Sequence, residues 1–306
     1  MSPTLRHGCT LLVLSALVSC AGEKPVVQQP ESTVAHAPAP ASKMERGLRL
    51  YAFDCGEIDI LDISFFHPET GTGKGEKKKF AASCYLVVHP KGTLAWDAGL
   101  RDDLAKLPEG KTFVRNGKPF AVQHVHKTLV AQYKEIGIDP GSIDFIGISH
   151  MHADHNGNAN LFPKATLLMQ KEEYEAAFGP EPAKFGFDPT NYPTLKDNPV
   201  KKLEGDFDVF GDGSVLIRRA IGHTPGHQTL FVKLPKTGNV LLSGDMVHFT
   251  ENWKNHGIPA FNFDKKESLA SIEKAEQFLT AHHATLWIQH DYEQNQTIRH
   301  APGYYE

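Results

Sequence analysis

The sequence has no long basic stripe, few cysteines and no apolar run of membrane-spanning length. Its formal net charge of -4 is spread over 306 residues, which gives no electrostatic reason to expect nucleic acid as a partner. Of its four cysteines, Cys9 and Cys20 lie at the start of the chain, and the two that remain do not make a disulfide framework. With an otherwise ordinary composition, these absences favour a globular enzyme that acts on a small molecule.

The beginning of the chain resembles a targeting segment. A positive end at residues 6–7 precedes an apolar core at residues 11–18, and that core is too short to span a bilayer. The letters LVSC at residues 17–20 resemble a bacterial lipobox, which implies a lipid on Cys20 and a place in the cell envelope, at the outer membrane or in the periplasm. The alternative is a plain secretory signal cleaved near Ala21.

A segment of low hydrophobicity follows. Residues 20–46 are rich in proline, alanine, glutamine and serine and have scarcely any large apolar side chains. Such a segment cannot bury enough surface to fold and is expected to act as a tether. We therefore predict a lipoprotein-type signal peptide over 1–19, the tether over 20–46 and one hydrolase domain over 47–306.

Two cysteines, Cys55 and Cys84, fall within the predicted domain. Export would permit a disulfide between them. Both lie in strand-like runs, however, where a buried free thiol is the simpler expectation.

Three imidazoles and a carboxylate crowd into six residues in the middle of the chain. His150, His152, Asp154 and His155 follow the apolar run at 143–148, which predicts a buried strand. Neutral imidazole and carboxylate are the ligands that hold zinc and related divalent ions. The alternating spacing lets two ions be bound from one turn of chain, whereas the alternative is a solvated loop that happens to be rich in histidine.

More metal-type side chains appear downstream, each at the end of an apolar run. His223 and His227 follow the run at 214–217, Asp245 follows 239–242, and His290 follows 285–288. Because candidate ligands appear at four strand ends, a solvated loop that is rich in histidine by chance is a poor explanation. A further pair, His124 and His126, lacks a strand-end position and a following Asp-His, so we expect it in a loop or at the start of a helix.

Strand-like and helical patterns alternate along the rest of the domain. Strands are expected at 48–53, 58–61, 84–88, 93–96 and 165–169, and helices at 127–136, 172–178 and 266–282. These patterns alone predict a mixed α/β fold with a buried sheet.

The motifs HMHADH at 150–155 and GHTPGH at 222–227, with Asp245 and His290, resemble the metallo-β-lactamase superfamily of metallohydrolases. The runs LMQKEEYEAA at 168–177 and HDYEQ at 290–294, with the run from Gly222 to Phe231, are similar to the quorum-quenching N-acyl-homoserine lactonases. The resemblance covers nearly all of the chain after Gly47. It implies a four-layer αββα sandwich, in which two mixed sheets are flanked by helices.

The resemblance also implies a site for two divalent metal ions, with zinc as the expected ion. One ion would be held by His150, His152 and His223, the other by Asp154, His155 and His290, and Asp245 would bridge them. In the family the histidine before Thr-Pro-Gly binds metal, so His227 is expected to hydrogen-bond within its turn. Asp97, at a strand end, is expected to brace a ligand imidazole from behind, or else to be only a turn former.

The implied activity is hydrolysis of the ring of N-acyl-homoserine lactones by a metal-bridging hydroxide, with Asp154 carrying a proton to the leaving oxygen. Many members place a tyrosine three residues after the bridging aspartate, where this chain has His248. An imidazole can donate the same hydrogen bond to the substrate, and a purely structural histidine is the alternative. The candidates for lining an acyl groove are Phe65, Phe66, Phe80 and Phe249.

Other functions fit parts of the pattern. A broad-specificity lactonase or esterase is the nearest alternative. A class B β-lactamase would fit export, but its common forms carry Cys or Ser near the position of Asp245. A glyoxalase II-like thioesterase has a C-terminal helical extension, whereas only sixteen residues follow His290. A non-catalytic, lipid-anchored binding protein is disfavoured because the ligand set is complete.

The sequence leaves three properties open: the native metal, the acyl-chain preference and the oligomeric state, for which a homodimer is one candidate.

Overall fold

The computed structural model describes residues 47–67 and 69–306. The predicted signal peptide and tether, including Cys20, lie outside the described residues. Contacts divide the chain into the units Met1–Met44 and Glu45–Glu306, and every described element belongs to the second unit. Within the described part of the chain, no helix has both the length and the apolarity needed to cross a membrane.

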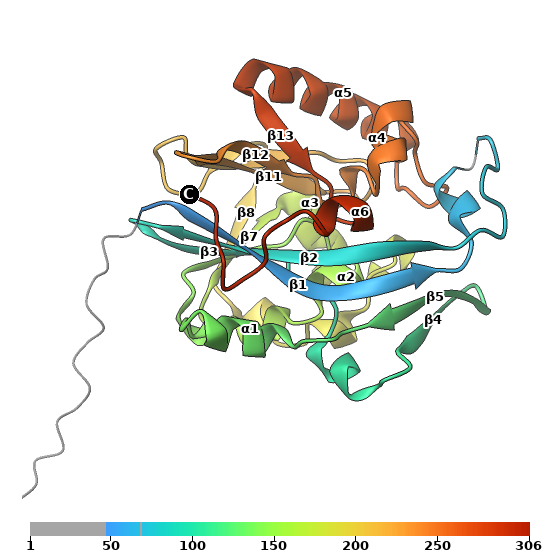
Figure 1. The fold of residues 1–306 in the computed structure, drawn as a ribbon, viewed down its shortest axis with the longest axis horizontal. Helices are drawn as coiled ribbons and strands as arrows, with labels where there is room; N and C mark the ends of the chain where they lie inside the picture. The colour runs from blue at the N-terminus through green and yellow to red at the C-terminus, as the bar shows by residue number, and fades with distance from the viewer. Residues whose placement is uncertain (1–46, 68) are drawn as a thin grey trace, which may run out of the picture. The chain divides into compact units, whose positions relative to one another are not determined.

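Two mixed β-sheets form the middle of the fold (Figure 1). The strand order is β4-β5-β1-β2-β3-β6-β7-β8 in the first sheet and β13-β12-β11-β10-β9 in the second. The strands of the first sheet are β1 (Arg49–Ile60), β2 (Lys78–His89), β3 (Gly92–Trp96), β4 (Lys111–Arg115), β5 (Lys118–His124), β6 (Phe145–Gly147), β7 (Thr166–Gln170) and β8 (Val200–Leu203). Those of the second are β9 (Phe207–Asp208), β10 (Val215–Arg219), β11 (Gln228–Leu234), β12 (Gly238–Leu242) and β13 (Ala284–Trp287).

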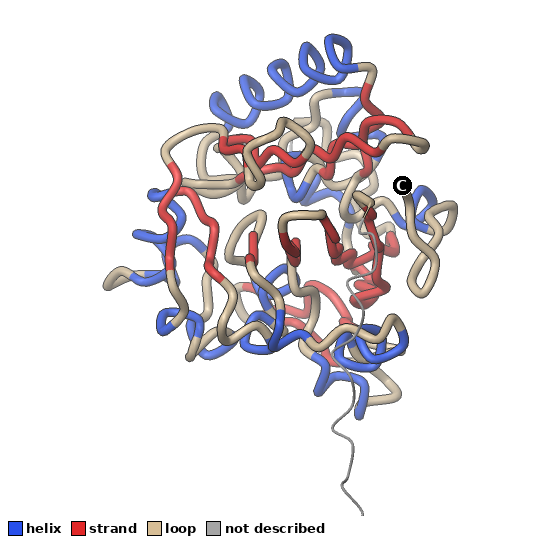
Figure 2. Tube along the Cα trace, turned by 90° about the vertical axis from the view of Figure 1, so that its left-hand side faces the viewer, coloured by secondary structure: helices blue, strands red, loops and turns tan. Residues whose placement is uncertain are grey.

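Helices cover the outer faces of both sheets, so that Figure 2 shows four layers. The α-helices are α1 (Leu129–Glu135), α2 (Ala153–Asn156), α3 (Lys171–Phe178), α4 (Thr250–Asn255), α5 (Lys265–His282) and α6 (Tyr292–Asn295). The 3-10 turns are Ile63–Phe66, Asp102–Lys106, Pro140–Ser142, Ala159–Leu161, Pro182–Phe185, Pro189–Asn191, Leu195–Asp197 and Gly244–Met246. The predicted αββα sandwich is confirmed.

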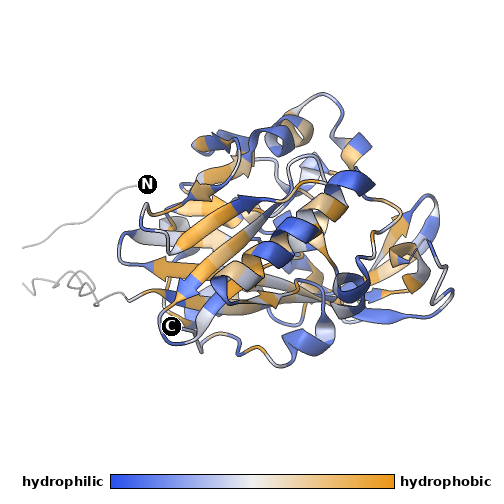
Figure 3. Cartoon of the chain, turned by 90° about the horizontal axis from the view of Figure 1, so that it is seen from above, coloured by the Kyte–Doolittle hydropathy of each residue, from blue (hydrophilic) through white to orange (hydrophobic). Residues whose placement is uncertain are grey.

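Buried hydrophobic clusters hold these layers together. Trp96 and Leu230 belong to a fully buried cluster that joins the inner faces of the two sheets. Tyr133 of α1 packs in a second cluster on the outer face of the first sheet. Ile272 and Ala275 of α5 pack against the second sheet, and the opposite side of this helix is hydrophilic (Figure 3). The amphipathic spacing predicted for residues 266–282 therefore corresponds to this packing.

The first sheet differs from the prediction at the edge formed by β4, β5 and β1. The two strands expected at 48–53 and 58–61 are one strand, β1, with an irregularity in its pairing between Asp54 and Glu57. A hairpin of β4 and β5 pairs with the end of β1, and the sequence did not predict it. His124, expected in a loop or at the start of a helix, is the last residue of β5.

The expectation of free thiols was wrong, because a disulfide joins Cys55 and Cys84. Cys55 lies in the irregular part of β1, and its Cα is 5.8 Å from that of Cys84, well within the range that a disulfide requires. Both side chains are buried. Gly99 approaches this bond closely, since a Cβ at that position would lie 2.8 Å from the Sγ of Cys84.

Replacing both cysteines by alanine should lower the free energy of unfolding by about 2–4 kcal/mol, because the bond closes a long loop in the unfolded chain. Denaturant unfolding of the variant and of the oxidised parent would measure this loss. Alkylation of the unfolded, unreduced parent should leave Cys55 and Cys84 unmodified. Modification of either thiol would contradict the pairing.

Candidate metal centre

One loop supplies four of the candidate ligands. It runs from the end of β6 to the start of α2, and His152 is the N-cap of α2 with an extended backbone, φ -71° and ψ 156°. Asp154 and His155 lie in the first turn of that helix. In the extended part of the loop, the side chains of His150 and His152 point the same way. Where the backbone becomes helical, those of Asp154 and His155 point to a neighbouring position.

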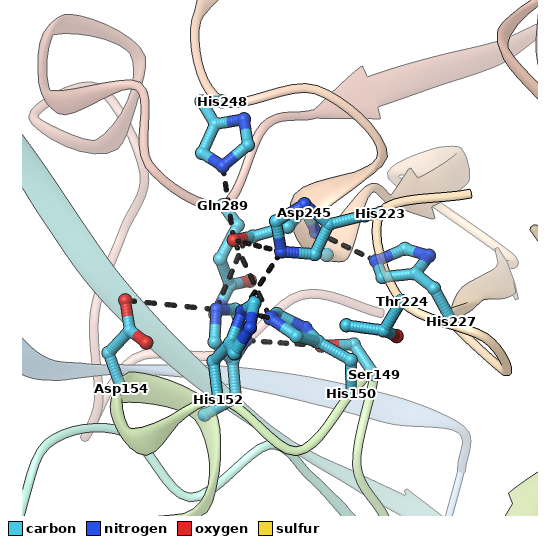
Figure 4. A network of polar contacts seen from close by, with 12 residues as sticks. Ser149, His150, His152, Asp154, His223, Thr224, His227, Asp245, His248 and Gln289 are labelled. Carbon is cyan, nitrogen blue, oxygen red and sulfur yellow. Dashed lines mark hydrogen bonds and ion pairs between the residues drawn. The ribbon is translucent and has the colours of Figure 1, made fainter. Parts of the chain in front are cut away.

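The first group of ligand atoms gathers around one oxygen of Asp245 (Figure 4). Donor atoms of His150, His152, His223 and Asp245 all lie within 4.8 Å of one another. His152 Nδ1 is 2.8 Å from His150 Nε2 and 3.0 Å from His223 Nε2. His223 Nε2 is 3.3 Å from Asp245 Oδ2.

The second group gathers around the other oxygen of the same carboxylate. Donor atoms of Asp154, His155 and His290 also lie within 4.8 Å of one another. Asp245 Oδ1 is 3.1 Å from His155 Nε2 and 3.0 Å from His290 Nε2. Asp245 thus directs one oxygen toward each group, and the structure brings all the predicted ligands together.

The donor set fits two divalent metal ions. His155 Nε2 and Asp245 Oδ1 are buried and have no hydrogen-bond partner, an arrangement that is costly unless a cation lies between such atoms. Burial lowers the pKa of His150 and His223 well below the usual value. Their imidazoles are therefore neutral, the form that binds a metal ion.

Each ligand imidazole uses its other ring nitrogen to contact an oxygen, which fixes the direction of the nitrogen that faces the centre. The pairs are His150 Nδ1 with Ser149 Oγ at 3.2 Å, His152 Nε2 with the Phe185 carbonyl at 3.0 Å, His155 Nδ1 with Asp97 Oδ2 at 3.0 Å, His223 Nδ1 with Asn262 Oδ1 at 3.0 Å and His290 Nδ1 with the Ala81 carbonyl at 2.6 Å. Only the contact to Asp97 was expected from the sequence.

Asp97 braces the ligand loop from behind. It is buried, and its backbone has a left-handed φ of 57°. Besides its contact to His155, it accepts hydrogen bonds from the Ser149 backbone N–H at 2.6 Å and from Ser149 Oγ at 2.9 Å. Its carboxylate therefore joins the start of the loop to its last ligand.

His227 lies outside both ligand groups. Its Nδ1 donates to the Ala220 carbonyl at 3.0 Å, and its Nε2 accepts from the Asp245 backbone N–H at 2.9 Å. Burial lowers its pKa to about 3, so the ring stays neutral and Nε2 remains an acceptor. His227 thus positions the backbone of Asp245.

Glu173, on α3, joins the two histidine loops and was not predicted. It is fully buried and accepts hydrogen bonds from the Met151 N–H at 2.8 Å, from Thr224 Oγ1 at 2.8 Å and from the Gly226 N–H at 2.9 Å. Gly226 is needed here because a Cβ would lie 2.4 Å from the backbone nitrogen of Glu173. A carboxylate beside two alanines on the buried face of α3 was the available sequence signal.

His248 lies beside the first group, at an aromatic wall. Its Nε2 is 3.2 Å from Asp245 Oδ2, and its buried Nδ1 has no partner. The rings of Phe66 and Phe80 are 4.9 and 6.3 Å from it. Of the remaining predicted phenylalanines, Phe249 is buried in the same cluster and Phe65 is 45% exposed.

Two aromatic residues that the sequence did not indicate complete the surroundings. The ring of Phe261 is 6.0 Å from those of His223 and His248. Phe187 contacts the centre from the other side, 5.6 Å from the ring of His152. The centre is therefore a polar cluster set between aromatic side chains.

Comparison with known proteins agrees with this geometry. Residues 78–281 match the family model described as the metallo-beta-lactamase superfamily. The chain is 30% identical over 263 residues to the N-acyl homoserine lactonase AttM of Azorhizobium caulinodans, covering 85% of this chain and 99% of that protein. It is 30% identical over 259 residues to the N-acyl homoserine lactonase AiiA of Bacillus thuringiensis subsp. kurstaki, covering 84% and 98%.

A solved structure of an N-acyl homoserine lactone hydrolase has N-hexanoyl-L-homoserine, its product, bound at the catalytic metal center. It resembles this fold with a TM-score of 0.72 at 27% identity and covers 84% of this chain and 98% of its own. The similarity thus extends over the whole length of these relatives.

Asp97→Asn should weaken metal binding about 10- to 100-fold, because the amide keeps the shape and tolerates the left-handed backbone but disrupts the contact to His155. Metal counting after dialysis against a competing chelator would measure the loss. Asp206→Asn, at an exposed ion pair with Arg218, is the matched control. Wild-type retention of metal by the Asp97 variant would contradict the bracing role.

Glu173→Gln should flatten the pH dependence of stability. Burial raises the pKa of Glu173 from 4.5 to about 7, so folding takes up a proton between these values and the free energy of unfolding falls as the pH rises through that window. The free energy of unfolding of the glutamine variant should not decrease over this pH range, whereas that of the wild type should decrease by up to about 3 kcal/mol. Urea unfolding of metal-depleted protein at several pH values would measure it.

Glu175→Gln is the matched control, because Glu175 lies on the exposed side of the same helix. The free energy of unfolding of this control should depend on pH as that of the wild type does. If the Glu173 variant showed the same pH dependence as the wild type, Glu173 would not be the group that takes up this proton.

Proposed function

The chain belongs to the metallo-beta-lactamase superfamily of metal-dependent hydrolases, and on that premise we propose that it opens the lactone ring of N-acyl homoserine lactones. The observation that carries the proposal is the placing of one Asp245 oxygen toward each of two ligand groups. The names of the relatives support the substrate class, and so does the product bound in the solved lactonase.

Two divalent ions, with zinc as the expected metal, would occupy this centre. His150, His152 and His223 would hold one ion, Asp154, His155 and His290 the other, and Asp245 both. Bound there, two such ions would make water a nucleophile near neutral pH and polarise a substrate carbonyl.

Two side chains of this protein would then handle protons and orient the substrate. The side chain of Asp154 is 21% exposed, so its free oxygen can pass a proton to the ring oxygen as the lactone opens. His248 can turn the Nε2–H that faces Asp245 toward the carbonyl oxygen of the substrate and steady the charge that develops there.

The aromatic side chains would receive the acyl chain. Phe66, Phe80 and Phe249 form the buried cluster next to His248, and Phe65 extends toward solvent, 5.5 Å from the ring of Phe120. A hydrocarbon chain that leaves the centre along this wall loses contact with water, which favours binding in proportion to the area buried.

The N-terminal motif LVSC supports a location in the cell envelope. We propose that Cys20 carries a lipid and that residues 21–46 connect it to the hydrolase domain. Mass spectrometry of the membrane fraction would detect the lipidated Cys20, whereas a chain that starts at Ala21 would indicate a secreted protein.

The test of the activity is a panel of acyl-homoserine lactones, β-lactams and thioesters assayed with protein of known metal content. We expect opening of the lactones that stops when a chelator removes the metal. Hydrolysis of the β-lactam nitrocefin without lactone turnover would instead indicate a β-lactamase, and turnover of simple esters at equal rates would indicate a broad esterase.

His248→Ala should leave the metal content unchanged and lower lactone turnover on the order of tenfold to a hundredfold, because a donor to the reacting carbonyl is lost. His248→Tyr should retain most of the turnover, since a phenol can donate the same bond. His256→Ala, at an ion pair with Glu276 away from the centre, is the matched control. Wild-type turnover in the alanine variant would contradict the assigned role.

A further inference from the structure

The β4–β5 hairpin leaves large apolar side chains partly exposed at the edge of the first sheet. β4 is the edge strand of the first sheet, and four of its five residues are exposed. Phe113 is 42% exposed and Val114 is 52% exposed. Phe113 rests one edge on Phe120, with its ring 6.2 Å away, but about half of each side chain stays open to solvent. Neighbouring large apolar groups that remain exposed on an edge strand indicate a surface that meets a partner.

The same hairpin carries unpaired positive charge on a chain whose net charge is -4. Residues 106–120 contain Lys106, Lys111, Arg115 and Lys118 but a single acid, Glu109. Among the residues that the structure describes, none of these four cations takes part in an ion pair. The hairpin itself therefore combines exposed apolar groups with three cations, Lys111, Arg115 and Lys118, that have no acidic partner within ion-pair distance in the described part of the chain.

This surface lies on the same side of the molecule as the aromatic wall of the metal centre. The guanidinium of Arg115 is 4.3 Å from the Phe261 ring and 5.5 Å from the Phe120 ring. Phe261 in turn contacts His223 and His248. One aromatic ring thus separates the hairpin from the centre.

We propose that the hairpin patch, formed by Lys111, Phe113, Val114, Arg115 and Lys118, docks on the surface of an anionic phospholipid bilayer. Phe113 and Val114 enter the boundary between head groups and acyl chains, as apolar groups of peripheral proteins do. The cations meet the lipid phosphates, to which basic residues near a negative membrane are attracted.

A second copy of this chain fits the patch less well. A two-fold symmetric contact through the hairpin would bring the same three cations of each copy together, and the patch itself contains no acid to separate them. Like charges facing each other oppose association. A negatively charged lipid surface, by contrast, is complementary to the patch over its whole extent.

The chain outside the described residues is long enough to let the hairpin reach a membrane. The hydrolase domain begins at one end of β1, and the hairpin pairs with the other end. β1 spans about 40 Å at the usual rise of a strand, whereas residues 21–46 reach at most about 90 Å when extended. A lipid on Cys20 would therefore raise the local concentration of the patch at the bilayer without preventing its contact.

Vesicle sedimentation tests the proposal without the lipid anchor. The chain from Glu45 onward is suitable, because Glu45–Glu306 is one compact unit. AttM and AiiA are also matched over 99% and 98% of their own lengths by alignments of only 263 and 259 residues. It should sediment with vesicles of equal parts phosphatidylcholine and phosphatidylglycerol and only weakly with phosphatidylcholine alone. Phe113→Ser with Val114→Ser, and separately Lys111→Gln with Lys118→Gln, should each lower the bound-to-free ratio on the order of tenfold.

Val130→Ser is the matched control, because Val130 is 47% exposed on α1, away from the hairpin. It should sediment like the parent, and all variants should keep the parent's melting temperature. Equal sedimentation of the parent and the Phe113/Val114 variant would overturn the proposal. So would light scattering that finds a dimer in the parent and a monomer in that variant, because the occupant would then be a second copy.

Discussion

The structure depends on one carboxylate placed between two sets of imidazoles. Burial alone would raise the pKa of Asp245, but the surrounding His290, His155 and His248 hold it well below its usual value. A buried anion is tolerated only where positive charge compensates it. Because one oxygen faces each histidine group, compensation on one side alone would leave the other oxygen uncompensated. Asp245 can therefore serve both groups of candidate ligands, and the rest of the fold keeps its carboxylate in this position.

The two sheets accomplish this by ending at a common edge. Asp245 follows β12 of the second sheet, and the loop of His150 to His155 follows β6 of the first. The buried cluster between the sheets fixes their separation, so the side chains beyond the strand ends are fixed as well. Asp97 and Glu173 then join loops that no backbone ladder connects. Rigid strands and a few buried acids thereby position the candidate ligands with the precision that metal binding requires.

The sequence predicted the features that depend on neighbours along the chain. Apolar runs followed by histidine and aspartate indicated the strand ends, and helical spacing indicated α5. It did not predict the β4–β5 hairpin, because strands exposed on both faces lack the alternation that marks a buried face. The role of Glu173 was not predicted, since only the folded chain brings Met151 and Gly226 to it. The Cys55–Cys84 bond depended on the irregularity in β1, which local composition does not reveal.

The aromatic residues around the centre follow from the same electrostatic constraint. Charges attract more strongly where water is excluded, and Phe66, Phe80, Phe187 and Phe261 surround the polar cluster on two sides. An apolar rim around a site also creates apolar surface that continues outward, through Phe120 to Phe65 and Phe113. The apolar side chains that exclude water from the ligand cluster therefore also form a hydrophobic surface beside it. The proposed acyl chain of the substrate and the proposed lipid surface are both hydrocarbon, so both match the apolar surface beside the centre.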